Sequence, residues 1–241
     1  MIDYDALEAR WKSLRTRGDV TVREVACEGV PRTLLCAESG PVDAPLVTVS
    51  AGVHGDEPAG VVALLTLVEE GALPARFAYR FWPCTNPSGY RAGTRANTEG
   101  VDVNRTFARG GTSPESRAII MANRDRKYVL ALDLHEDCDA SGFYCYAYND
   151  GGMAKRVVAS IIEAGFKVDA EAVLTPDPEA ERVAIGGMSY SLLLLRNASA
   201  RVLTFETPSR VQLERRVEMH RRAVLSALDA LANRDDSQTL R

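Results

Sequence analysis

Three short apolar segments of this 241-residue chain each lead directly into a side chain suited to chemistry. One segment runs into a turn that contains His54, the second is followed by His135, and the third ends on Glu206. Short runs rich in apolar and β-branched residues are typical of buried strands in a parallel sheet. Sites in such sheets form beyond the carboxyl ends of the strands, so we expect these three residues to gather at one edge. The three segments are residues 46–50, 129–134 and 201–206.

Segments with helical spacing alternate with these strand candidates, which predicts the fold class. Ser113 followed by Pro114 and Glu115 is a typical helix start, with a capping hydroxyl and a proline in the first turn. Alternating strands and helices predict one α/β domain with a mixed, mostly parallel sheet that is flanked by helices on both faces. We place this single catalytic domain at residues 1–232 and expect a flexible polar tail at 233–241. Further strands are expected at 20–27, 32–38, 79–83 and 142–148, and helices at 3–16, 58–67, 113–126, 152–165 and 211–232.

Composition limits the classes of partner. A net charge of −4 without a basic block offers no field for nucleic acid, and no apolar run is long enough to cross a membrane. The amino-terminal segment lacks the apolar core of a signal peptide. Five cysteines without CxxC spacing favour free thiols in a reducing cytoplasm over a disulfide framework. The oligomeric state stays open at this point.

The spacing of His54, Glu57 and His135 indicates a metal site. Two histidines and one carboxylate are a typical ligand set for a catalytic zinc ion, which keeps its fourth position open. A tight turn at Gly55, with a helix starting at Pro58, lets His54 and Glu57 face one ion. We therefore predict one zinc ion per chain. The alternative is that His54 and Glu57 form only a hydrogen-bonded surface pair.

A loop rich in glycine, asparagine and arginine follows the strand candidate at 79–83. It spans 86–95 and 100–107 and contains Arg95, Asn104 and Arg105. Arginine suits a carboxylate or a developing oxyanion, because its planar group offers paired charged donors. Solvated surface arginines are the alternative interpretation.

Glu206 closes an apolar strand, where a carboxylate is unusual unless it is paired or active. Beside a zinc ion it can take a proton from water and pass it to a leaving nitrogen. A salt bridge at the end of the strand is the alternative.

These motifs together resemble the zinc carboxypeptidase family of metallopeptidases. They are HGDE, NPxGY, GxRxNxxGVDxNRxF, LDLHE and a late TFE, and they cover residues 47–208 in order. The likeness is to the small cytosolic branch near the murein peptide amidases, which grades into the succinylglutamate desuccinylase and aspartoacylase group.

The resemblance implies a role for each matching residue. His54, Glu57 and His135 match the zinc ligands, and Glu206 matches the general base and acid. Three further residues match substrate-contacting positions: Arg95 the residue that stabilises the oxyanion, and Asn104 and Arg105 the pair that grips a substrate carboxylate.

Five other positions are considered beside these motifs. Tyr190 lies where the family carries a tyrosine that covers the substrate, and a tyrosine packed on a helix face is the alternative. Asp133 is placed to orient a ligand imidazole. Glu136 and Asp137 could disfavour an anionic substrate or bind a second metal. We expect His220 at the surface.

We weigh three functions. The first is a zinc metallocarboxypeptidase-type hydrolase that cleaves a C-terminal peptide or peptide-like amide bond of a small peptide. The second keeps the site but takes an N-acyl amino acid, as desuccinylases and aspartoacylases do. The third is a catalytically inactive fold that binds a peptide or partner. Because every expected site residue is present, the sequence favours an enzyme.

Overall fold

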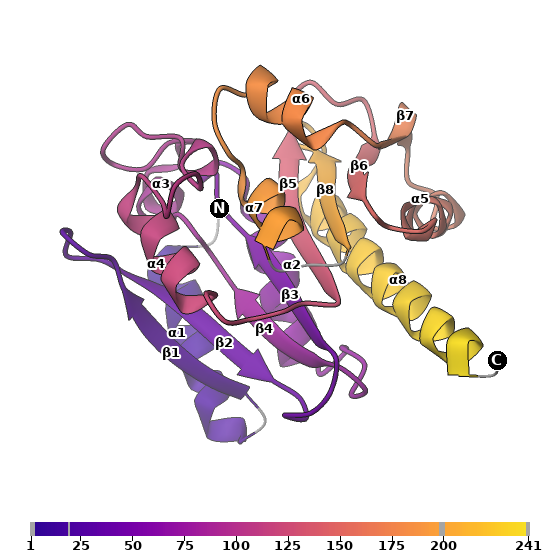
Figure 1. Ribbon diagram of the computed structural model, residues 1–241, viewed down its shortest axis with the longest axis horizontal. Coiled ribbons are helices and arrows are strands. Elements are labelled where there is room, and N and C mark those ends of the chain that lie inside the picture. The colour runs from indigo at the N-terminus through magenta and orange to yellow at the C-terminus, as the bar shows by residue number, and fades with distance from the viewer. Residues whose placement is uncertain (1–2, 19, 198–200, 240–241) are drawn as a thin grey trace.

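The computed structural model describes residues 3–18, 20–197 and 201–239, and its centre is a mixed sheet of eight strands (Figure 1). The strand order is β1-β2-β4-β3-β5-β8-β6-β7. The sheet confirms the predicted α/β fold class. Its strands are β1 (Val20–Ala26), β2 (Thr33–Ser39), β3 (Leu46–Ala51), β4 (Ala78–Trp82), β5 (Leu130–Asp137), β6 (Phe143–Tyr148), β7 (Val168–Leu174) and β8 (Val202–Pro208).

The four central strands, β4, β3, β5 and β8, are parallel and are buried on both faces. Their pairing places Val49 beside Leu132, and Leu132 beside Leu203. Both flanks contain antiparallel pairs, with β2 running against β4 on one side and β6 against β8 on the other. The carboxyl ends of β3, β5 and β8 therefore meet at one edge of the sheet.

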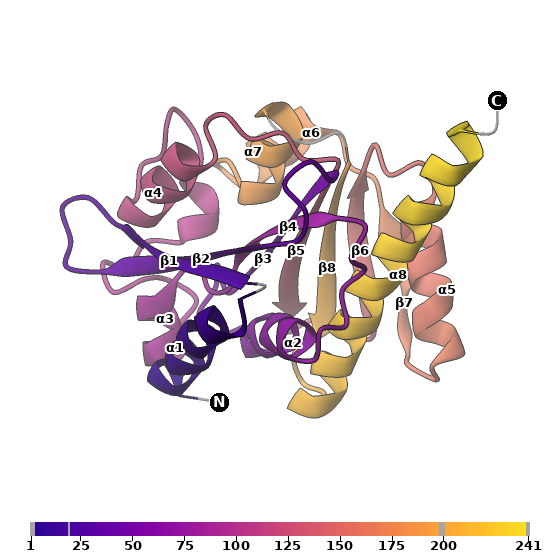
Figure 2. The same ribbon diagram turned by 90° about the horizontal axis from the view of Figure 1, so that it is seen from below.

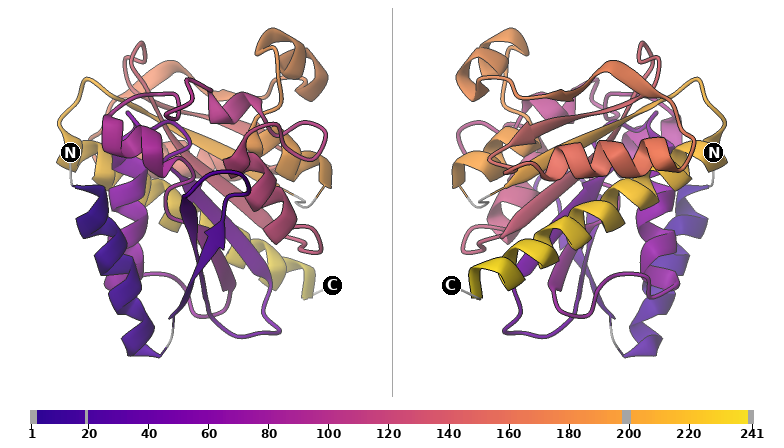
Figure 3. Two further views of the ribbon diagram at one scale, coloured as in Figure 1. Left: turned by 90° about the vertical axis from the view of Figure 1, so that its left-hand side faces the viewer. Right: turned by 90° about the vertical axis from the view of Figure 1, so that its right-hand side faces the viewer.

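Helices cover both faces of this sheet and make two apolar cores (Figure 2). The larger core joins the sheet to α1, α2, α5 and α8, and the smaller one joins it to α4 and α7. Helix α5 lies alongside α8 (Figure 3). The helices are α1 (Tyr4–Ser13), α2 (Pro58–Glu69), α3 (Pro87–Ala92), α4 (Pro114–Ala122), α5 (Met153–Glu163), α6 (Pro178–Ala184), α7 (Tyr190–Asn197) and α8 (Leu213–Thr239), with short 3-10 helices at Leu14–Arg17 and Val103–Arg105.

The end of α8 and the presence of β7 differ from the sequence prediction. Helix α8 continues to Thr239, so the predicted domain end at residue 232 falls inside this helix. The edge strand β7 was also not predicted; its residues are partly buried or exposed, so it lacks the long apolar run that marks the central strands. No described helix is both long and apolar enough to span a bilayer.

Candidate metal centre and catalytic cavity

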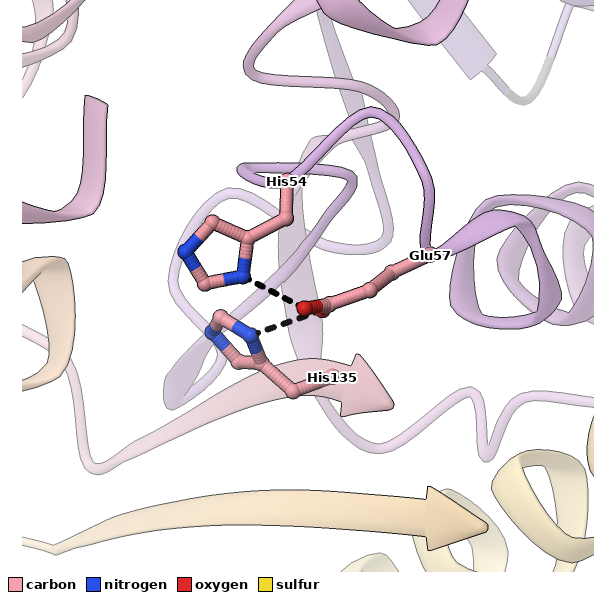
Figure 4. A group of neighbouring side chains, drawn as sticks. All are labelled: His54, Glu57 and His135. Carbon is pink, nitrogen blue, oxygen red and sulfur yellow. Dashed lines mark hydrogen bonds and ion pairs between the residues drawn. The ribbon is translucent and has the colours of Figure 1, made fainter. Parts of the chain in front are cut away.

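His54, Glu57 and His135 converge at the carboxyl edge of the sheet (Figure 4). The Nδ1 atom of His54 lies 2.5 Å from Glu57 Oε1, and that of His135 lies 2.9 Å from Glu57 Oε2. All three side chains are buried. Residues far apart in the sequence thus present three donor atoms to one point.

The loop that carries His54 owes its shape to close backbone packing. A Cβ atom on Gly55 would lie 1.9 Å from the backbone of Gly89 in α3, so only glycine fits there. The backbone N–H of Glu57 donates to the carbonyl of His54 over 3.3 Å, which closes the turn. Pro58 then starts α2. The turn therefore directs His54 and Glu57 to the same side.

Two further carboxylates lie behind the imidazole rings. His135 Nε2 is 3.2 Å from Asp133 Oδ2, and His54 Nε2 is 3.3 Å from Asp102 Oδ1. The His54 contact is not aligned as a hydrogen bond, and its Nε2 atom has no other partner among the described residues. Burial acts to raise the pKa of Asp102, but His54 and Arg95 hold it well below its usual range.

This arrangement fits a metal ion. When a carboxylate takes the Nε2–H of an imidazole, the Nδ1 lone pair is left free for a metal. Both Nδ1 atoms here face the carboxylate of Glu57, and nitrogen with carboxylate oxygen suits zinc. The donor set thus supports the predicted ligands, and the contact of Asp133 with His135 agrees with its predicted orienting role.

Strand register brings Glu206 to the same place. Glu206 on β8 pairs with His135 on β5 and with Tyr144 on β6, so the three side chains share one face of the sheet. Glu206 keeps a small exposed surface in the cavity although protein atoms surround it. Burial raises the pKa of Glu206 to about 8, with His135 opposing the rise and Glu57 adding to it. A carboxylate with that pKa can exchange protons near neutral pH.

A second row lies beside the first, two residues before His135 on β5 and before Glu206 on β8, and two residues after Tyr144 on the antiparallel β6. Thr204 and Tyr146 of this row line the cavity. Asp133 pairs with Thr204, and Thr204 pairs with Tyr146. From α7, Ser191 Oγ lies 2.8 Å from Thr204 Oγ1 and donates to Asp133 Oδ2 over 3.1 Å. Thr204 and Tyr146 were not predicted from the sequence, although Thr204 lies two positions before Glu206 on the same strand.

The predicted arginines reach the cavity from the loop after α3. Arg95 Nη1 lies 3.3 Å from His54 Nδ1 and 3.6 Å from Glu57 Oε1. The Oδ1 atom of Asn104 accepts from the backbone N–H of Tyr190 over 2.9 Å, which leaves its amide donors for the cavity. Arg105 is partly exposed and also lines the cavity. The guanidinium groups of Arg95 and Arg105 and the amide of Asn104 thus offer hydrogen-bond donors beside the metal centre.

The cavity has a volume of about 360 Å³ and is lined by all the predicted site residues except Tyr190. Its other walls were not predicted, because they come together through strand register and through the placement of α6 and of the start of α7. They include Tyr144, Tyr146, Glu181, Ser189, Ser191 and Thr204.

The predicted role of Tyr190 as a substrate cover is wrong. Its side chain is 1% exposed and packs against Phe107, with ring centroids 5.0 Å apart. Its hydroxyl accepts from Asn123 Nδ2 over 3.2 Å. The residue therefore belongs to the smaller core, and only its backbone serves the site, through Asn104.

Two other polar residues differ from expectation. His220 is fully buried, not at the surface, and its Nε2 lies 3.2 Å from Thr207 Oγ1; burial lowers its pKa to about 3. Glu136 accepts from the backbone N–H of Ala59 over 2.6 Å and pairs with Arg216. These contacts occupy the Glu136 carboxylate, which argues against its use for a second metal.

A family model agrees with this geometry. The succinylglutamate desuccinylase/aspartoacylase catalytic domain matches residues 43–180, which is more than half of the chain. The chain belongs to this family. The match includes His54, Glu57 and His135 and ends before Glu206.

Among curated proteins, this desuccinylase/aspartoacylase family member resembles murein peptide amidase A from Escherichia coli strain K12. The two are 32% identical over 89 residues, which cover 32% of this chain and 36% of the relative. The same values hold for murein peptide amidase A of Escherichia coli O157:H7. The chain thus matches about a third of the length of these relatives.

Solved structures share the fold of this family member. A candidate metallopeptidase from Shewanella denitrificans OS217 superposes with a TM-score of 0.77 at 22% identity, covering 94% of this chain and 89% of the other. A metallo-carboxypeptidase from Burkholderia cenocepacia superposes with a TM-score of 0.70 at 17% identity. The match covers 93% of this chain and 68% of the other. At these identities the likeness establishes a carboxypeptidase-like fold and confirms the predicted architecture.

Proposed function

We propose that the protein is a zinc-dependent hydrolase of the metallocarboxypeptidase type, which cleaves a C-terminal peptide or peptide-like amide bond. The observation that carries this proposal is the pairing of Glu206 with His135, which sets a general base beside the metal ligands. The family match and the shared fold support hydrolysis. Residues 1–232 would form one catalytic domain with one zinc per chain, in the cytoplasm.

His54, Glu57 and His135 would hold the zinc ion. When bound, zinc polarises a carbonyl group and makes a nearby water more acidic. Glu206 would accept a proton from that water on its carboxylate, while the water oxygen attacks the amide carbon. It would then deliver the proton to the leaving nitrogen as the C–N bond breaks.

The arginines would handle negative charge. Arg95, whose Nη1 lies 3.6 Å from Glu57 Oε1, is placed to donate to the carbonyl oxygen as it becomes negative. Arg105 and the amide of Asn104 would bind the terminal carboxylate and hold the scissile bond against the metal centre.

An N-acyl amino acid is the alternative substrate, and the family match is the observation that favours it. The same guanidinium groups would then hold a small dicarboxylate. The similarity to murein peptide amidase A supports the peptide-like amide instead.

A hydrolysis screen on protein loaded with zinc separates these functions. It would compare dipeptides, murein-type peptides, N-succinylglutamate and N-acetylaspartate, with release of the amine as the signal. Cleavage of peptides supports the first proposal, and cleavage of N-acyl amino acids alone supports the alternative. Absence of turnover with every compound would contradict both and favour a binding protein.

A further inference from the structure

Glu115 is a fully buried carboxylate that lies outside the catalytic cavity. It belongs to the first turn of α4, where Ser113 is the helix cap. Its Oε1 atom accepts from Arg32 Nη1 over 2.6 Å. Both Glu115 oxygens also accept from the side-chain amide of Asn97, over 3.3 and 3.2 Å. The buried carboxylate of Glu115 on α4 therefore holds the loop that contains Asn97.

Asn97 is the centre of that loop. Its Oδ1 atom accepts from the backbone N–H groups of Glu99, over 3.1 Å, and of Val101, over 3.0 Å. Its own backbone N–H donates to the carbonyl of Val101 over 3.0 Å. The amide donors reach Glu115, so both ends of the Asn97 side chain are bound. The turn from 97 to 101 is therefore fixed relative to α4.

This turn connects two residues of the site. Arg95 precedes it, and Asp102 follows it. Asp102 Oδ2 accepts from Arg95 Nε over 3.1 Å, and Asp102 Oδ1 lies 3.3 Å from His54 Nε2. The conformation of the turn therefore sets both contacts of Asp102, the one with Arg95 and the one with His54.

Arg32 ties the same network to the hairpin of β1 and β2. Besides Glu115, its guanidinium contacts Ser88 Oγ at 2.9 Å and pairs with Glu99. A buried ion pair adds little net stability compared with apolar residues of the same size. In some proteins such pairs are retained because they fix one specific geometry.

We propose that Glu115, through Asn97, is a positioning residue that holds Asp102 against His54 and thereby prepares the metal centre. The inference rests on the proposed function, because it assumes that His54 is a zinc ligand.

The test is the affinity for zinc, measured by competition with a chelator in wild-type protein and in the variant Glu115→Gln. Loss of an outer partner of a metal ligand typically weakens metal affinity about ten- to a hundred-fold. Glu115 acts on such a partner through Asn97, so we expect a loss near the lower end of this range, about ten-fold. The matched control is Glu38→Gln, because Glu38 accepts from the buried Arg80 over 2.8 Å and lies outside the cavity. The control should lower thermal stability and leave the zinc affinity unchanged.

A double-mutant cycle with Asp102→Asn shows whether the effect passes through Asp102. If it does, Glu115→Gln should weaken zinc binding by less than about two-fold in the Asp102→Asn background. Additive losses, or an unchanged affinity in the single variant, would overturn the inference. If Glu115→Gln does not fold, Asn97→Asp takes its place, because it keeps the Oδ1 acceptor and removes the donors to Glu115.

The outcomes also separate this inference from the proposed function. Wild-type protein that binds zinc tightly but hydrolyses nothing contradicts the function, while the cycle still decides the role of Glu115. Wild-type protein that hydrolyses peptides while Glu115→Gln keeps its zinc affinity contradicts the inference alone.

Discussion

Glu206 lies next to His135 in the sheet, and its raised pKa suits a group that takes and returns a proton. The variant Glu206→Gln keeps the size of the side chain and removes the proton acceptor. We expect kcat to fall about a thousand-fold while one zinc per chain is retained. Steady-state kinetics with elemental analysis checks this, and Glu163→Gln on the exposed face of α5 is the control. Activity above about a tenth of the wild-type value would contradict the assignment.

Arg105 tests how the substrate is held. Replacing it by alanine removes a charged donor worth about 2 kcal/mol to a bound carboxylate, or about thirty-fold in kcat/KM. Substrates whose terminus is capped as an amide should lose much less. The comparison of free and capped peptides is the measurement, with the exposed Arg124→Ala as control. Equal losses for both substrates would show that Arg105 does not bind the terminus.

Tyr190 tests the revised assignment of the tyrosines. Tyr190→Phe leaves the amide of Asn123 without its hydroxyl acceptor, so we expect a loss of about 1 kcal/mol in the free energy of unfolding. The activity should stay within about two-fold, because the side chain does not reach the cavity. Denaturant unfolding and kcat/KM are the readouts. A large fall in kcat with unchanged stability would restore Tyr190 to the site.

The sequence predicted those site residues that stand in compact motifs or at strand ends. His54 and Glu57 share one turn, and His135 follows an apolar strand. Tyr144 was missed because its place beside Glu206 depends on the register of β6 against β8, which local periodicity does not set. His220 was assigned to the surface because arginines flank it, yet its side of α8 faces the sheet.

At the scale of elements, α2 packs unusually close to β5. A Cβ atom on Gly60 would lie 2.7 Å from Leu134 Cβ, in the helix that begins just after Glu57. In Gly60→Ala the gain in helix propensity is about 1 kcal/mol, and overpacking costs about 1 to 3 kcal/mol. We therefore expect a lower melting temperature and weaker zinc binding. Val62→Ala, at a partly exposed position of α2, is the control, and unchanged zinc affinity in Gly60→Ala would contradict the packing argument.

Central strands were easier to predict than peripheral elements. Strands β3, β5 and β8 each begin with a short run of mainly apolar residues, because both of their faces are buried. Helix α6 has no buried residue, so its sequence carries no apolar stripe, although its Glu181 reaches the cavity. Elements that only line a site leave a weak pattern.

At the scale of the whole molecule, the predicted domain end can be tested by truncation. Ala230, Leu231 and Ala232 are buried, whereas Asn233 is exposed. A chain that ends at Ala232 should therefore melt within about 2 °C of the full chain and keep its activity. Calorimetry and kinetics on both chains provide the check. A large loss of stability would show that the last turns of α8 belong to the domain.

The proposed hydrolysis depends on one zinc ion held by His54, Glu57 and His135. The most direct test is to titrate metal-free protein with zinc while following peptide hydrolysis. We predict that the rate rises linearly and levels off at one zinc per chain, and that His135→Ala shows no such rise. Hydrolysis that is independent of zinc, or a zinc response that survives in His135→Ala, would contradict the central claim.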